Sequence, residues 1–561
     1  MAHGNLSCLA GLLIVLSAHA YSGDALTEML KAGLGNIVKE TINSPVTYEK
    51  GTIPTWLSGN FIRHACGTFG ETDHRNKNLP NYIEHLFDCF EMGSKFKINN
   101  GRVTFTNRWY DTTVEDIFNT YRRQMNASSM FVHSIYSQMN ANQIDKWFGN
   151  MSAKNKVSKI PNVSWWLVGN QAIAMSGQPI GVIIDPNDVT QKGYIQYDDN
   201  NLGVPDTTQY LFSNNPAHAQ TEADGTLWST VSVVKFETQS HLKIKRVVYK
   251  IGHDLGRHVV GTFNYEDSNL TRCKGTRPYP DFGARFGYLH SIAMTENYII
   301  LPETALMDDP CVFTRYDKYE PFLPQGFQYE STGYSRLLVM RKSDGQFIAN
   351  ITMPPFFATH QLNAFEDGNI IHMDMLTYND SSIFDKHMFV ENLLSENVYT
   401  TNLSRISISI SGKTARMRNL RGDGKSPSAF EMPTINHAYN GKKYEYAYMT
   451  RNFDRREQNA ITKLHVDTGV EQEFILPEGM FVQDPHFVSR QGAITEDDGV
   501  ILAQGVDGIK HKAFMIIVDA RTMMMIAHVT APDIALFGQH SRFFPMTVGK
   551  PDTGIDGTIV G

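Results

Sequence analysis

Three histidines lie in apolar, strand-like segments of the chain: His290 in GYLHSIAMTENYIILPE, His360 in FFATHQLNAFEDGNIIHMD and His540 in FGQHSRFFP. An imidazole buried without a partner is costly, and a single such histidine is usually a core residue hydrogen-bonded to a carbonyl. Three of them together favour a metal site. A set of imidazole ligands without cysteine suits Fe, Cu, Zn or Ni, and geometry selects among these metals.

Other common catalytic signatures are missing from the sequence. It contains neither H-E-x-x-H nor G-x-S-x-G, which excludes the commonest zinc protease and serine hydrolase motifs. Gly412-Lys413-Thr414 and Gly424-Lys425-Ser426 resemble the ends of phosphate-binding loops, but Ser407 and Asn419 stand where the first glycine is required. Both segments are predicted to be turns.

Short β-rich runs position the histidines and recur from about residue 95 to the C-terminus, many joined by turn dipeptides such as Asn100-Gly101 and Asp367-Gly368. The clearest runs are Arg102 to Thr106, Tyr298 to Pro302, Ile370 to Met373 and Val500 to Ala503. Helices are predicted only at Gly23 to Ile42 and Met130 to Phe148. The pattern favours an all-β fold closed as a β-propeller, without a clean repeat of 40 to 50 residues.

The composition is that of a globular protein with an acidic balance. The 561 residues carry a net charge of −7, which argues against nucleic acid as a partner. Hydrophobic residues make up 41% of the chain, enough for a large core, so intrinsic disorder is excluded. No linker rich in Pro, Ser or Gly divides the chain, which favours one domain.

The N-terminus has the features of a secretory signal. Residues 1–20 contain no Lys, Arg, Asp or Glu, the apolar block Leu9 to Leu16 is too short to span a bilayer, and Ala18-His19-Ala20 is a cleavage pattern. We predict a signal peptide at residues 1–20, a single mature domain at 21–561, an extracellular location and no transmembrane span. Seven sequons offer glycosylation sites: Asn126, Asn150, Asn162, Asn269, Asn350, Asn379 and Asn402.

Four cysteines remain after removal of the signal: Cys66, Cys89, Cys273 and Cys311. In an oxidising compartment they allow two disulfides in any of three pairings. Because none forms a C-x-x-C pair, a cysteine zinc site is not expected.

The histidine segments and their flanks resemble the carotenoid cleavage oxygenase family, which includes the β-carotene dioxygenases and the retinoid isomerohydrolase of the visual cycle. The resemblance covers roughly residues 45 to 548. Further matches, in chain order, are LSGNFIR at 57–63, HLFD at 85–88, Ala217-His218, DGT at 224–226, FEMPTIN at 430–436 and DDGV at 497–500.

This resemblance implies a seven-bladed β-propeller with one Fe(II) on its axis, held by four histidines beneath an apolar tunnel. His290, His360 and His540 match the second, third and fourth ligands. The family's partners are carotenoids, retinoids or other apolar polyenes, with O2 inserted across a conjugated double bond to give two carbonyl products. Peripheral membrane contact at the tunnel mouth is also typical of the family.

The first ligand departs from the family pattern. Members read H-P-H-x-x-x-D-G, with iron on the second histidine, whereas this chain reads HAQTEADG from His218 to Gly225. Counting back from Asp224 places Gln220 at the ligand position, where a neutral carboxamide is a weaker donor than imidazole. His218 lies two residues earlier, on the same face of a strand, and is the alternative ligand.

The carboxylates that support the ligand histidines in the family are altered as well. Glu431 matches one of them, Asp484 stands one methylene shorter where a second is expected, and Gly177 stands at the third. Loss of such a partner typically weakens metal affinity or activity by about 10–100-fold.

The resemblance also bears on the cysteines and on function. Cys66 and Cys89 replace residues that are usually glycine in the family, which suggests a Cys66–Cys89 disulfide and leaves Cys273 with Cys311. Two functions stay open: a secreted Fe(II) dioxygenase that cleaves a polyene, or a catalytically impaired, secreted carotenoid-binding, lipid-binding or extracellular matrix glycoprotein. Fold alone does not decide between them.

Overall fold

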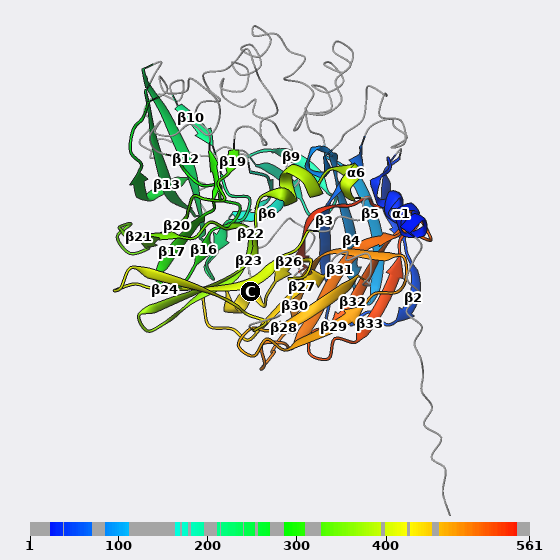
Figure 1. Cartoon of the computed structure of the whole chain (residues 1–561). Helices are drawn as coiled ribbons and strands as arrows, with labels where there is room; N and C mark the ends of the chain where they lie inside the picture. The colour runs from blue at the N-terminus through cyan, green and yellow to red at the C-terminus, as the bar shows by residue number, and fades with distance from the viewer. Residues whose placement is uncertain are drawn as a thin grey trace, which may run out of the picture.

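The structure is a computed structural model. It describes residues 23–37, 39–69, 85–110, 163–168, 171–177, 181–195, 210–213, 215–238, 241–252, 256–269, 285–308, 327–393, 399–422, 427–451 and 459–546. Across these residues the chain is built mainly of antiparallel sheets, arranged as a seven-bladed β-propeller, as predicted (Figure 1).

The first four blades in chain order come from residues 41–353, with one C-terminal strand added. The first blade contains β1 (Thr41–Pro45), β5 (Arg102–Trp109), β4 (Phe90–Asn99), β3 (Gly59–Thr68) and β34 (Gly538–Pro545). The second contains β6 (Ser164–Val168), β7 (Gln171–Met175), β8 (Val182–Asp185) and β9 (Thr190–Tyr194). The third contains β10 (Tyr210–Ser213), β11 (Gln220–Thr221), β12 (Leu227–Thr238), β13 (His241–Ile251), β14 (Arg257–Asn264) and β15 (Ser268–Asn269). The fourth contains β16 (Ala293–Met294), β17 (Tyr298–Glu303), β20 (Ser335–Arg341) and β21 (Phe347–Met353).

The C-terminal half supplies three more blades. The fifth contains β22 (Phe357–Asp367), β23 (Ile370–Tyr378), β24 (Asn402–Ser409) and β25 (Thr414–Asn419). The sixth contains β26 (Phe430–Thr434), β27 (Tyr446–Arg451), β28 (Ala460–His465) and β29 (Glu471–Ile475). The seventh contains β30 (Met480–Ser489), β31 (Gly499–Asp507), β32 (Lys512–Asp519), β33 (Met525–Thr530) and β2 (Thr47–Gly51).

Short elements accompany the blades. A separate ribbon is formed by β18 (Leu306–Asp308) and β19 (Phe327–Tyr329). The short helical elements are α1 (Gly23–Lys31), η1 (Ala32–Leu34), η2 (Leu86–Asp88), the π-helix η6 (Ile383–His387), α6 (Val390–Leu393) and η7 (His437–Tyr439).

The pattern of burial follows the position of each strand in its blade. Every residue of β31, in the middle of the seventh blade, is buried, because blades pack against each other on both faces of a middle strand. In contrast, β25 lies at the outer edge of the fifth blade and has no buried residue. The turn between β4 and β5 uses Asn100 and Gly101, both at positive φ, as that dipeptide predicts.

The propeller closes by joining the two ends of the chain. N-terminal β3 pairs with C-terminal β34, and β2 pairs with β33. In Figure 1 the blue strands therefore stand beside the orange and red ones. The innermost strands β16, β22, β26, β30, β34 and β6 contact one another in turn around the axis, which brings residues distant in sequence to one central place.

The predicted N-terminal helix is shorter than expected. Helix α1 ends at Lys31 and one 3-10 turn follows to Leu34, so the prediction of a helix to Ile42 was wrong. Glycines at 33 and 35 disfavour continuation of the helix. Ile42 instead belongs to β1, which pairs with β5. The predicted helix Met130 to Phe148 lies outside the described residues.

The predicted disulfide between Cys66 and Cys89 is present and buried. It joins β3 to the residue that precedes β4. Cys273 and Cys311 lie outside the described residues, as do residues 1–20. Of the sequons, Asn350 and Asn379 are exposed, Asn269 and Asn402 are partly exposed, and Asn126, Asn150 and Asn162 lie outside the described residues. Within the described part of the chain, no helix has both the length and the apolar character needed to cross a bilayer.

Candidate metal centre

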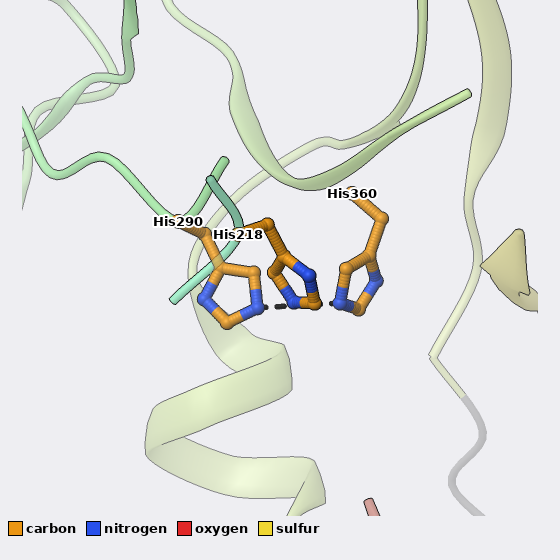
Figure 2. Close-up of side chains that lie close together, drawn as sticks. All are labelled: His218, His290 and His360. Atoms are coloured by element: carbon orange, nitrogen blue, oxygen red, sulfur yellow. Dashed lines mark hydrogen bonds between the residues drawn. The ribbon is translucent and has the colours of Figure 1, made fainter. Parts of the chain in front are cut away.

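Four imidazoles meet on the propeller axis: His218, His290, His360 and His540. The Nε2 atoms of His290 and His360 lie 3.2 Å apart, and those of His540 and His360 lie 3.0 Å apart. The ring centroid of His218 lies 4.9 Å from that of His290, 4.8 Å from His360 and 4.4 Å from His540. Figure 2 shows the His218, His290 and His360 rings together, with the contact between His290 and His360 dashed.

His218 and His290 come from irregular segments that precede β11 and β16. The two segments run side by side through a parallel bridge between His218 and Ser291. The His218 N–H donates to the His290 carbonyl at 3.1 Å, and the Ile292 N–H donates to the His218 carbonyl at 3.3 Å. This backbone bridge brings the two rings to the same level on the axis.

The structure groups His218, and not Gln220, with the other three histidines. Gln220 is buried in β11, and its side-chain nitrogen donates to the Ile292 carbonyl at 3.0 Å. The count from Asp224 pointed to Gln220 because it assumed that the family's spacing is kept here. His218 was the alternative, and its bridge to Ser291 is a tertiary contact that the sequence does not reveal.

The strands that carry His360, His540 and the supporting carboxylates are irregular at the level of the cluster. The pairing register shifts near Gln361 in β22, after Glu431 in β26 and after Gln483 in β30. Met432 and Asp484 have φ angles of 54° and 40° at two of these places. Such bulges redirect side chains, here at the level where the rings converge on the axis.

His360 is held by a well-bonded carboxylate. Its Nδ1 lies 2.5 Å from Oε2 of Glu431, which also accepts from the Met432 N–H at 2.9 Å. The other oxygen, Oε1, accepts from the Thr359 hydroxyl at 2.8 Å and from the Tyr378 hydroxyl. Burial raises the pKa of Glu431, but His360 and these donors outweigh it and hold the pKa below its usual value, so the group is ionised at neutral pH.

His540 has a carboxylate partner despite the shorter side chain. Its Nδ1 lies 3.0 Å from Oδ1 of Asp484, and the Ser541 N–H donates to Oδ2. The positive φ of Asp484 belongs to the bulge in β30. Asp484 is one methylene shorter than the glutamate expected at this position, yet it still contacts His540, and the bulge in β30 lies at this point.

His290 has a phenol as its partner. Its Nδ1 lies 3.0 Å from the hydroxyl of Tyr288, two residues earlier in the same segment. Gly177 contributes no side chain, and a Cβ built on it meets only the Asn215 carbonyl, at 3.8 Å. The sequence analysis missed Tyr288. The signal in the sequence was that Tyr288 precedes His290 by two residues, a spacing that can place the phenol beside the imidazole.

The protonation states of the rings favour a cation between them. Burial, together with the neighbouring rings, lowers the pKa of His218 and of His290 well below the usual value, so both are neutral. An imidazole that donates its Nδ1–H to a carboxylate keeps a lone pair on Nε2, and two such lone pairs that face each other at about 3 Å repel. Among the described residues, the buried Nε2 of His218 has no hydrogen-bond partner.

A bound metal ion would relieve this repulsion. Two nitrogens that share one cation at bonds of about 2.1 Å lie roughly 3 Å apart when the angle between them is near 90°. The observed Nε2 separations of 3.0 and 3.2 Å have this size. The ligand atoms of His218, His290 and His360 lie within 4.8 Å of one another, and Nε2 of His540 lies 3.0 Å from that of His360, so the cluster has a size that suits one transition-metal ion.

A cavity opens beside the cluster. His290, His360 and Glu431 line part of its wall. The remaining walls are largely apolar and come from α1, η1, η2, η6 and α6. They include Leu30, Leu34, Leu86, Phe87, Phe384, Met388 and Leu393. Walls of this kind favour an apolar ligand over a polar one.

A propeller with histidines converging on its axis beneath an apolar cavity defines a class of metal-centre folds, and the sequence comparisons give the family. The profile of the retinal pigment epithelial membrane protein family matches residues 35–545. The chain therefore belongs to this family, that of the carotenoid cleavage oxygenases, as the resemblance predicted.

Relatives match over nearly the whole chain. Carotenoid isomerooxygenase of Galleria mellonella is 23% identical, over 91% of this chain and 94% of its own length. Carotenoid cleavage dioxygenase 8 of Arabidopsis thaliana is 24% identical, over 88% of this chain and 83% of its own. Cobalt-substituted Synechocystis apocarotenoid oxygenase shares the fold, with a TM-score of 0.67 and 19% identity over 94% of this chain and 100% of that one.

Proposed function

We propose that this protein is a secreted, Fe(II)-dependent oxygenase that cleaves a conjugated double bond of a carotenoid or apocarotenoid. One C=C bond is broken and each carbon receives one oxygen atom of O2, so two carbonyl products form. The observation that carries the proposal is the convergence of four imidazoles, two of which, His290 and His360, line a largely apolar cavity. Relatives named for carotenoid and apocarotenoid oxygenation support the choice of substrate class.

Each departure from the family pattern has a counterpart in the structure, which supports an intact site. Gln220 replaces the family's first ligand histidine, but the His218 ring lies beside the ring of His360 instead. Asp484 contacts His540, and the Tyr288 hydroxyl contacts His290. An impaired binding protein has no need to keep partners on three ligand histidines. This favours the oxygenase over the alternative of a catalytically impaired lipid-binding or matrix glycoprotein.

The residues of this chain have distinct roles in the proposed reaction. His218, His290, His360 and His540 would hold the metal, which supplies a redox centre for the otherwise slow reaction of a polyene with O2. Glu431 and Asp484 keep the protons of their histidines on Nδ1, so that Nε2 stays free. Leu86, Phe87 and Phe384 pack along the polyene, fix which bond lies beside the histidines and exclude water.

Secretion is part of the proposal, and two structural features support it. The Cys66–Cys89 disulfide belongs in an oxidising compartment. Asn350 and Asn379 are exposed and so accessible to glycosylation. A bound polyene is expected as the partner, with peripheral membrane contact at the cavity mouth for its delivery.

The test is metal analysis and product analysis on protein secreted from a eukaryotic host. We expect near-stoichiometric iron and the appearance of two carbonyl fragments from at least one member of a carotenoid and apocarotenoid panel under O2. His360→Ala, which removes the ring that contacts the other three, should lose both iron and products. Polyene binding without iron or products in the wild type would instead support the carrier or matrix function.

A further inference from the structure

Three of the candidate ligand histidines have a polar partner on Nδ1, the nitrogen that faces away from the cluster. Two of these partners are carboxylates, and the third is a phenol. His360 and His540 contact carboxylates at 2.5 and 3.0 Å. His290 contacts the hydroxyl of Tyr288 at 3.0 Å. Among the described residues, no carboxylate is seen on Nδ1 of His290, and Gly177, where the family resemblance places the third supporting carboxylate, offers no side chain.

The Tyr288 side chain is fixed by its surroundings. Its ring packs edge-to-face on Phe327 and Phe384, at centroid distances of 5.7 and 5.6 Å, and stacks on Phe357 at 6.2 Å. Its backbone is anchored too, because its N–H donates to the Leu306 carbonyl at 2.8 Å. A phenol held in this way presents its oxygen at a set place and cannot easily follow a moving ring.

We propose that Tyr288 is the positioning residue for His290, replacing the carboxylate that is missing at Gly177. The phenol oxygen accepts a hydrogen bond from Nδ1–H of His290, which fixes the ring orientation and leaves Nε2 free for the metal. A neutral phenol is a weaker acceptor than a carboxylate, so His290 is a less electron-rich ligand than His360 or His540. This inference rests on the proposed metal site.

The test uses Tyr288→Phe, which keeps the packed ring and removes only the oxygen. Co(II) serves as the probe, and its affinity is measured by competition with a chelator while its visible spectrum is recorded. Because a phenol is a weaker acceptor than a carboxylate, we expect a loss of Co(II) affinity below about 10-fold and a changed spectrum, with circular dichroism unaltered. The matched control is Tyr329→Phe, from the same aromatic cluster, whose hydroxyl donates to the Asn379 carbonyl and contacts no histidine.

A double-mutant cycle separates positioning from general stability. If Tyr288 acts through His290, Tyr288→Phe adds no further loss of Co(II) affinity in a His290→Ala background. Equal losses in both backgrounds would show a purely structural role and overturn the inference. So would a folded Tyr288→Phe protein with wild-type affinity and spectrum. Failure of the wild type to bind Co(II) at all would overturn the proposed metal site itself, and this inference with it.

Discussion

The two halves of the histidine cluster are built differently. His360 and His540 lie on the inner strands β22 and β34, and their carboxylate partners come from neighbouring blades. His218 and His290 lie on irregular segments that are held by a backbone bridge, and His290 has a phenol partner from its own segment. One half is therefore fixed by charged contacts between blades, and the other by local contacts.

This difference indicates which histidine partners contribute most to metal affinity. A carboxylate on Nδ1 raises the basicity of an imidazole and locks its tautomer, whereas a phenol or a backbone contact does so less. Substitutions in the carboxylate-supported half should thus weaken metal binding most, and changes near the other half should have smaller effects.

The largest effect is expected for Glu431→Gln. The amide keeps the size of the side chain but loses the charge, and four donors then compete for a weaker acceptor. We expect a 10–100-fold loss of metal affinity, measured by chelator competition. Glu366→Gln is the control, because Glu366 lies on β22, the strand of His360, and accepts from Thr295 and Asn297. Similar losses in both variants would remove the special role of Glu431.

A loss of about 10-fold is expected for Asp484→Asn, at the lower end of the usual range. Asparagine tolerates the positive φ at this position, so the substitution tests charge and not backbone strain. The loss should be smaller than for Glu431→Gln, since Asp484 accepts from fewer groups. Titration of both variants with Co(II) under identical conditions gives the order, and the reverse order would contradict the comparison.

A small effect is expected from pH. Two ordinary imidazoles with a pKa of about 6.5 would make metal affinity fall roughly 14-fold between pH 7.5 and 6.0, through proton competition. Burial lowers the pKa of His218 and of His290, so both stay neutral through this window. We therefore expect their contribution to be under about 3-fold. The pH dependence of Co(II) affinity in His218→Ala and in the wild type measures it, and a steep fall that disappears in the variant would contradict the buried, neutral ring.

The smallest effect is expected for Gln220→His. Because His218 already lies in the cluster and the Gln220 amide is bonded to Ile292, a new imidazole at 220 has no place beside the other rings. We expect iron content to stay within measurement error of the wild type, by mass spectrometry. A gain of iron in this variant would show that His218 does not replace the family's first ligand.

The sequence predicted much of the fold and part of the site, for physical reasons that differ by residue. Histidines in apolar segments are costly, so His290, His360 and His540 stood out from their local sequence, and the resemblance added Glu431 and Asp484. The sequence offered His218 only as an alternative ligand and gave Tyr288 only a spacing signal, because a backbone bridge and a packed ring place these two residues through tertiary contacts. The end of α1 was misplaced because amphipathic spacing continued into β1, where pairing with β5 decides the structure.

The pairing of β3 with β34 sets an order of events during synthesis. His540 lies on the last strand of the propeller, so a ribosome-bound chain that has already formed its first blades still lacks one imidazole of the four. The first blade is also incomplete until β34 has left the ribosome and can pair with β3. A metal ion that needs all four imidazoles would bind only after the chain is finished, and any truncation before residue 538 removes the closing strand and this imidazole together.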